Sequence, residues 1–248
     1  MELGRRPVGP APFFDDVDRN YVVAQLEGQM DAPVDLMVAA GPSSPLLLPG
    51  ASPDPGADEG RQAEQLALEL GSLEPRLQVT LTSPGAAGAP VFTVSGRASP
   101  GVVRFVGVPR VNLFRNLLEA IRRASTGDHG LPAGWSQALE RLPRPVHTRV
   151  FATPTCPGCP PVVATAIGMG LATDRLRVEV VDGLAGSDLV REYGVSGVPT
   201  VVLDGQLSLE NPSPDESLLE FVLHAADRSR PAPTVASVPF RACGRLPD

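Results

Sequence analysis

The stretch that decides the fold is Thr153-Pro154-Thr155-Cys156-Pro157-Gly158-Cys159-Pro160. It follows an apolar run at 150–152, which predicts a buried strand, and it precedes an apolar run at 162–171, which predicts a helix. A C-x-x-C pair between a buried strand and a helix is typical of redox-active cysteines. The sequence therefore makes Cys156 and Cys159 the candidate reactive pair.

The position of Cys156 before a helix has a chemical consequence. We expect its sulfur at the N-cap, where the unpaired N–H groups of Gly158 and Cys159 favour the thiolate. Free cysteine titrates near 8.5, whereas cysteines in this setting titrate between roughly 3.5 and 7.5. Cys159 is then placed to attack a mixed disulfide on Cys156. Pro157 suits the first helical position, and Pro161 is expected to distort the first turn.

Two similar halves are indicated by an internal repeat. Gly88-Ala89-Pro90-Val91-Phe92 matches Gly197-Val198-Pro199-Thr200-Val201, and an alternating strand precedes each of them. Residues 40–45 align on 152–157 without a gap, and Ser44 and Leu47 then stand where the second half has its cysteines. We expect a first half that keeps the scaffold of the site without its thiols.

The pattern predicts an α/β chain of two such halves. In the first half the expected elements lie at 13–30, 34–39, 59–70, 77–82, 91–95, 102–106 and 111–124, and the helix that would occupy 83–89 is expected to be lost. In the second half they lie at 148–152, 162–171, 176–181, 187–193, 200–203, 206–209 and 216–227. We expect a degenerate domain at 13–124, a linker with a short helix at 125–145, a catalytic domain at 146–228 and a flexible tail at 229–248.

Composition narrows the function classes. The formal net charge is −7, and no basic stripe compensates for it. We therefore do not expect the protein to bind nucleic acid. No segment approaches the ~20 apolar residues that a membrane span needs. Three cysteines are too few for a secreted disulfide scaffold and suit a reducing compartment, so a cytoplasmic location is expected.

The T-P-T-C-P-G-C-P run, followed about forty residues later by Tyr193-Gly194-Val195-Ser196-Gly197-Val198-Pro199-Thr200, resembles the thioredoxin superfamily. Within it, the chain resembles the two-domain glutaredoxin-like protein disulfide oxidoreductases, which fuse two thioredoxin folds. The segment 102–109 also looks like the start of the last helix in the first half of that family. The resemblance implies two tandem thioredoxin-like folds, each with a central mixed sheet flanked by helices.

The same resemblance implies roles for individual residues. Cys156 would be the nucleophile, Cys159 the resolving thiol and Pro199 a cis-proline. Val198 would offer main-chain groups to a substrate lying alongside as an added strand. Thr155 and Pro157 would complete the substrate-contacting set.

The chain also departs from the family pattern. The first half has no C-x-x-C, which puts electron relay between the halves in doubt. Val150 stands where thioredoxin has a buried carboxylate beneath the site, so the proton of Cys159 needs another acceptor.

The resemblance implies that the substrates are protein disulfides. It also implies that the protein binds no cofactor. Electrons would come from glutathione or from an NADPH-dependent thioredoxin reductase. The layout is similar to the N-terminal part of the flavoprotein component of alkyl hydroperoxide reductase, which makes a peroxiredoxin a further candidate partner.

Three other functions stay open. The first is a zinc site that uses Cys156 and Cys159. A closed zinc site needs four ligands, however, and the other candidates show no spacing that would complete one: His129, His147, His224 and Cys243. An iron–sulfur cluster shared between two chains is the alternative of a different class, a carrier module. The third is an interaction protein that uses the altered site around Ser43 and Ser44. Cys243 is expected to be an exposed tail thiol.

Overall fold

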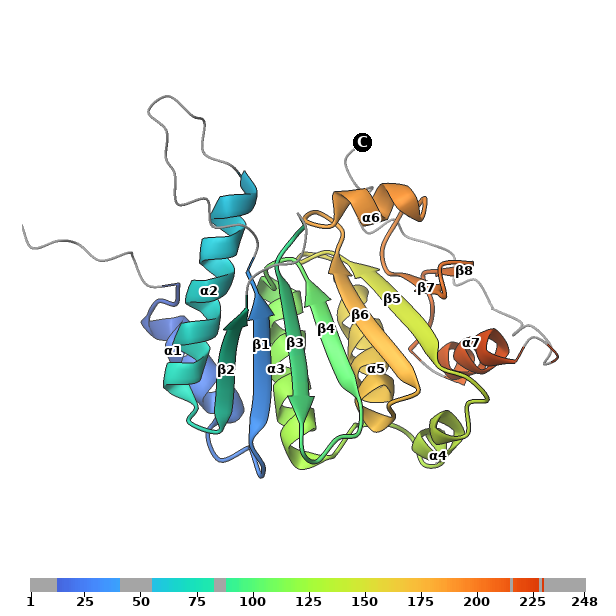
Figure 1. Ribbon diagram of the computed structural model, residues 1–248, viewed down its shortest axis with the longest axis horizontal. Coiled ribbons are helices and arrows are strands. Elements are labelled where there is room, and N and C mark those ends of the chain that lie inside the picture. The colour runs from blue at the N-terminus through green and yellow to red at the C-terminus, as the bar shows by residue number, and fades with distance from the viewer. Residues whose placement is uncertain (1–12, 41–54, 83–87, 215, 228, 230–248) are drawn as a thin grey trace, which may run out of the picture.

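The computed structural model describes residues 13–40, 55–82, 88–214, 216–227 and 229. In chain order the elements are α1 (Asp16–Leu26), β1 (Val34–Ala39), α2 (Pro55–Leu73), β2 (Leu77–Thr82), β3 (Val91–Gly96), β4 (Val102–Val106), α3 (Val111–Thr126), α4 (Trp135–Glu140), β5 (Val146–Ala152), α5 (Cys159–Ala172), β6 (Leu176–Asp182), α6 (Ser187–Glu192), β7 (Thr200–Leu203), β8 (Leu207–Glu210) and α7 (Glu216–Ala226) (Figure 1).

The expected order of elements is confirmed, and so is the mixed α/β fold class. Strands β1, β2, β4 and β7 have the predicted bounds, because alternating or fully apolar runs mark them clearly in the sequence. The helix expected to be lost at 83–89 falls partly outside the described residues, and 88–90 are not helical. The altered site of the first half, with Ser43, Ser44 and Leu47, and the tail with Cys243 also lie outside them.

All eight strands of the described chain form one sheet with the order β2-β1-β3-β4-β6-β5-β7-β8. Pairing is parallel between β1 and β2, β4 and β6, and β5 and β6, and antiparallel elsewhere. The carboxyl ends of β1, β2, β4, β5 and β6 therefore share one edge of the sheet. Loops that leave this edge are the usual place for sites in such sheets.

The two halves are joined edge to edge by β4 and β6. Their register runs from Val103 opposite Val178 to Val106 opposite Val181. Gly101 N–H, just before β4, donates to the carbonyl of Leu171 in α5 at 3.2 Å. A Cβ on Gly101 would lie 1.8 Å from the oxygen of Gly170, so only glycine fits here. The division into domains at 124 and 146 stays a prediction.

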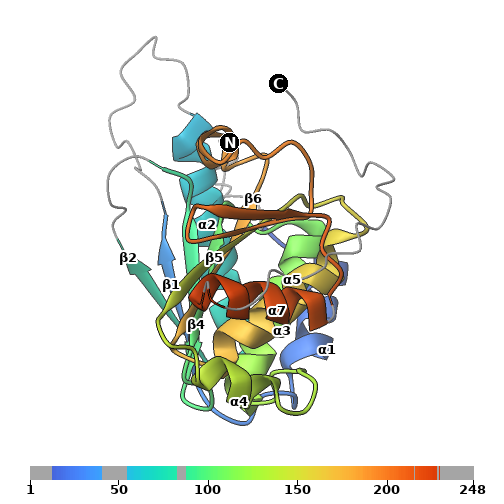
Figure 2. The same ribbon diagram turned by 90° about the vertical axis from the view of Figure 1, so that its right-hand side faces the viewer.

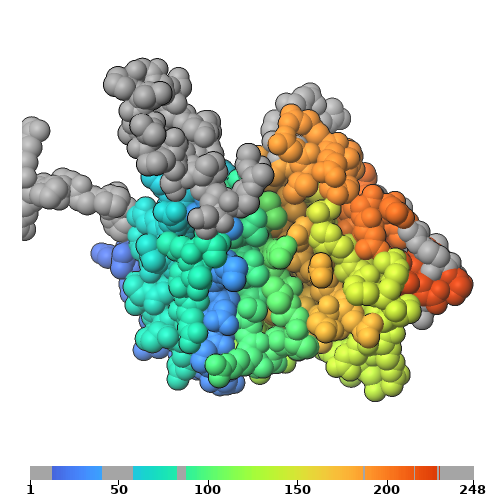
Figure 3. Space-filling model, viewed as in Figure 1, coloured from blue at the N-terminus to red at the C-terminus, as the bar shows by residue number. Residues whose placement is uncertain are grey.

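Helices α3 and α5 pack side by side behind this joint. Figure 1 shows them behind the sheet, and Figure 2 shows α1, α3, α5 and α7 on the same side of it. Over β1, β3, β4 and β6 no helix of the described chain covers the other face, which is open in the space-filling view (Figure 3). Alternation of buried and exposed residues along β1 and β4 agrees with this one-sided cover.

The open face carries a cross-strand ion network centred on Glu179 of β6. Its Oε2 accepts from Arg149 Nε at 3.0 Å and lies 2.9 Å from His147 Nε2, both on β5. Arg104 Nη1 on β4 lies 3.6 Å from its Oε1. Burial acts to raise the pKa of Glu179, but the hydrogen bond from His147 and the charges of His147 and Arg149 outweigh it and lower the pKa to about 2.

Gly101→Ala is expected to lower the free energy of unfolding by about 2–3 kcal/mol, because the new methyl group meets a main-chain oxygen that cannot rotate away. Urea denaturation followed by circular dichroism measures this. Gly158→Ala is the control, since a Cβ there meets nothing within 4 Å. Equal midpoints for the two variants would contradict the close approach of the halves.

Glu179→Gln is expected to lower the free energy of unfolding at pH 7 by about 2 kcal/mol. Because the folded pKa is lowered, the carboxylate stabilises the fold above the ordinary value of 4.5, and this contribution is lost as the pH falls toward about 2. The difference between wild type and variant should therefore shrink across that window in urea titrations. The exposed Glu140→Gln serves as control, and a deficit independent of pH would contradict the ion network.

Candidate active site

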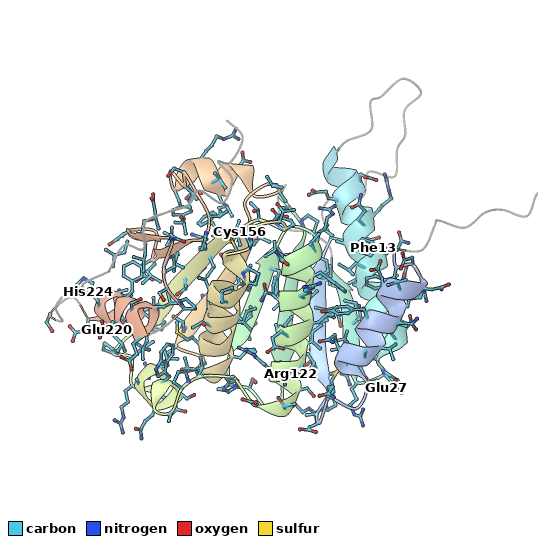
Figure 4. The ribbon with its side chains drawn as sticks, turned by 180° about the vertical axis from the view of Figure 1, so that it is seen from behind. Phe13, Glu27, Arg122, Cys156, Glu220 and His224 are labelled. Atoms are coloured by element: carbon cyan, nitrogen blue, oxygen red, sulfur yellow. A yellow bond between two sulfur atoms is a disulfide. The ribbon has the colours of Figure 1, made fainter. Side chains whose placement is uncertain are left out.

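The C-x-x-C segment forms a loop, residues 153–158, which we call the dithiol loop. It leaves the carboxyl end of β5 and enters α5 at the shared edge of the sheet. Figure 4 shows Cys156 at the N-terminal end of α5, beside the start of α3. Helix α5 begins at Cys159, three residues earlier than predicted, and its N-cap is Gly158. The expectation of Cys156 at the N-cap is therefore wrong by two residues, because the Pro157-Gly158 pair forms a turn before the helix.

The prolines around the loop fit the helix start differently from the prediction. Pro157 lies in the turn, whereas Pro160 and Pro161 take the second and third helical positions. The first four N–H groups of a helix have no intrahelical partner, so neither proline removes a hydrogen bond. The predicted distortion at Pro161 is thus not required.

Cys156 and Cys159 form a disulfide, and their Cα atoms are 5.5 Å apart. Cys156 is 4% exposed and Cys159 1%, whereas Thr155, Pro157 and Gly158 around them are exposed. The pair thus lies just beneath a rim of exposed residues, with Cys156 nearer to solvent. An incoming group reaches Cys156 first.

The second predicted element faces the disulfide from the β7 side. The Val198–Pro199 peptide bond is cis, and the carbonyl oxygen of Val198 lies 3.9 Å from Cys156 Sγ. A disulfide sulfur carries no hydrogen, so this contact becomes a hydrogen bond only when Cys156 is a thiol. Thr200 Oγ1 donates to the carbonyl of Gly197 at 2.8 Å and fixes the turn. The fold thus brings together segments 42 residues apart.

The first half contributes directly to this site. Asn112 Nδ2, at the start of α3, donates to the carbonyl of Cys156 at 3.3 Å, and Asn112 N–H donates to the carbonyl of Pro154 at 3.2 Å. Asn116 Nδ2, one turn later, donates to the carbonyl of Pro160 at 3.3 Å. The dithiol loop is therefore held from both sides of the joint.

A buried carboxylate lies at the end of the neighbouring strand. Asp182 is 3% exposed and stands opposite Ala152 in the β5–β6 register. Burial raises its pKa, although the N–H of Leu184, which donates to Oδ1 at 3.0 Å, and the charge of Arg110 act in the opposite direction. Val150, beneath the loop, is fully buried and cannot exchange protons.

Within the described ranges, no three His, Cys, Asp or Glu side chains gather in a way that could hold a metal ion. Cys243, named in the zinc alternative, lies outside these ranges. None of the described helices has the length and apolar character to cross a bilayer.

Sequence patterns give little warning of Asn112, Asn116 and Asp182. The two asparagines are 44 residues from the carbonyls they bind, so no local sequence pattern links them to the loop. A weak signal existed in the four-residue spacing, which puts both on one helix face. Asp182 had a clearer one, since a charged residue directly after the apolar pair Val180-Val181 ends a buried strand.

Comparison with known proteins gives a family-model match in the second half of the chain. Residues 146–222 match the family model of the thioredoxin domain. The alkyl hydroperoxide reductase of Staphylococcus epidermidis is 24% identical over 149 residues, which is 60% of this chain and 29% of that protein. The chain thus spans less than a third of the length of that relative.

Solved structures resemble the chain over both halves. The NTD_N/C domain of alkylhydroperoxide reductase from Enterococcus faecalis has a TM-score of 0.68 at 16% identity and covers 84% of this chain and 99% of its own. A protein disulfide oxidoreductase from Aeropyrum pernix K1 has a TM-score of 0.64 at 22% identity and covers 86% and 94%. The family-model match thus covers part of the second half, and the likeness to these solved structures, which concerns the fold alone, extends over both halves.

Proposed function

We propose that this chain is a thiol–disulfide oxidoreductase that exchanges disulfides with proteins through Cys156 and Cys159. The observation that carries the proposal is the disulfide itself, formed at the sheet edge and facing the Val198 carbonyl. The match of residues 146–222 to a thioredoxin domain supports it.

The proposed reaction needs only the two thiols and a substrate disulfide. The thiolate of Cys156 attacks one substrate sulfur, a new S–S bond forms, and the other substrate sulfur leaves as a thiolate. Cys159 then loses its proton to solvent and attacks the sulfur of Cys156. The substrate thiolate leaves, and the Cys156–Cys159 disulfide remains, so that two electrons have passed to the substrate.

The geometry supports this order of attack. Cys156 is the more exposed of the two and has exposed neighbours in Thr155 and Pro157. Cys159 lies in the first turn of α5, bonded to the Cys156 sulfur and deeper than it. We propose that Thr155, Pro157, Val198 and Pro199 form the substrate contact, with Val198 pairing as in an added strand.

We propose protein disulfides as the substrates and a peroxide-reducing protein of the peroxiredoxin class as one of them. The similarity to alkyl hydroperoxide reductase supports this choice. Glutathione or a thioredoxin reductase would return electrons to the disulfide. A cytoplasmic location stays a prediction from the small number of cysteines.

The first test is a redox titration of the purified chain in glutathione buffers. We expect a two-electron couple between about −270 and −120 mV that disappears in Cys156→Ser. Values near the lower limit indicate a reductase and values near the upper limit a disulfide-forming protein. Absence of a titrating dithiol, together with visible absorbance, would replace the proposal by the iron–sulfur carrier.

The order of attack is tested with 5,5′-dithiobis(2-nitrobenzoate) in a Cys243→Ser background. The reduced dithiol should release about two equivalents of thionitrobenzoate, because Cys159 displaces the second. Cys159→Ser should release about one and keep the other bound to Cys156. Cys156→Ser should react much more slowly than either. Fast reaction of Cys156→Ser would exclude Cys156 as the sole nucleophile.

A further inference from the structure

Side chains on one face of α3 bind three main-chain carbonyls of the second half. Asn112 Nδ2 donates to Cys156, Asn116 Nδ2 to Pro160 and Arg123 Nη1 to Ala164. We call these three bonds the cross-half ladder. The acceptors are four residues apart along the dithiol loop and α5, so the ladder follows one side of that segment.

The ladder is anchored at both ends. At its far end Arg123 is fixed by Glu119, whose Oε1 accepts from Nε at 2.7 Å, and by the carbonyl of His129, which accepts from Nη1 at 2.9 Å. At the near end the N–H of Asn112, one of the free donors of the first turn of α3, is satisfied by the carbonyl of Pro154.

The backbone at the near end is strained. Val111, the residue before Asn112, has φ = 48°, a left-handed conformation that is unusual for a β-branched residue. Its side chain is 60% exposed, so packing does not explain the conformation. The strain falls where the chain turns so that both the N–H and the amide of Asn112 face the dithiol loop.

Asn116 is costly for stability at its position. It is 5% exposed, and its Oδ1 has no hydrogen-bond partner among the described residues. A buried acceptor without a donor destabilises a fold, and an apolar side chain of similar size avoids this cost. Compared with such an apolar side chain, Asn116 therefore adds one interaction, the hydrogen bond from Nδ2 to the carbonyl of Pro160.

We propose that Asn112 and Asn116 are positioning residues that hold the dithiol loop from the first half, and that this sets the thiolate character of Cys156. The inference rests on the proposed function. Asn112 fixes the carbonyl of Cys156, and Asn116 fixes the first turn of α5. Together they hold the loop at the N-terminus of α5, where the free N–H groups of the first turn favour a thiolate. The half without cysteines thereby tunes the half that has them.

The test compares Asn112→Leu and Asn116→Leu in the full chain. Asn20→Leu is the matched control, because it makes the same chemical change at an exposed position of α1. For each protein we would measure the pKa of the Cys156 thiol from thiolate absorbance, the dithiol–disulfide equilibrium with glutathione, and the urea midpoint.

Both site variants should raise the pKa of Cys156 and shift the glutathione equilibrium toward the disulfide by about five- to tenfold, since the thiolate loses oriented donors. Asn116→Leu should do so while keeping or raising the urea midpoint, which separates positioning from a merely structural role. The control should match wild type in all three measurements.

An unchanged pKa and equilibrium in a folded Asn116→Leu protein would overturn the proposal, whatever its stability. If Asn112→Leu does not fold, Asn116→Leu decides alone. A wild-type dithiol that titrates but exchanges with no protein disulfide would refute the proposed function and leave the ladder measurable. A wild type with no titrating dithiol would overturn both.

Discussion

Parallel pairing of β4 with β6 is the interaction on which the rest of the structure depends. It turns two four-stranded arrangements into one sheet and aligns the carboxyl ends of both halves on one edge. It also sets α3 beside α5, because α3 packs behind β1 and β3 of its own half, whereas α5 packs behind β6 and reaches across the joint to β4. Without it, the start of α3 would be nowhere near the dithiol loop.

This arrangement makes the candidate active site a composite. The disulfide, the Val198 carbonyl and the buried Asp182 come from the second half, whereas Asn112 and Asn116 come from the first. The first half, which has no cysteines, thus still contacts the loop that carries them.

The sequence predicted the strands and the pairing of Cys156 with Cys159 well, because both depend on local signals. Alternation marked β1 and β4, and the spacing of Cys156 and Cys159 pointed to redox chemistry. The start of α5 was misjudged, since consecutive prolines suggest a helix breaker although the first turn tolerates them. Contacts such as Asn112 to Cys156 were out of reach, because they arise only once β4 and β6 pair.

The close approach at Gly101 has a consequence for motion. At Gly101 main chain packs against main chain with no side chain between, so the halves cannot slide past one another at this contact. Residues 127–134, which connect the two halves, are then not expected to act as a hinge. In the proposed reaction, an electron donor and an electron acceptor would therefore dock one after the other at the same exposed rim around Cys156.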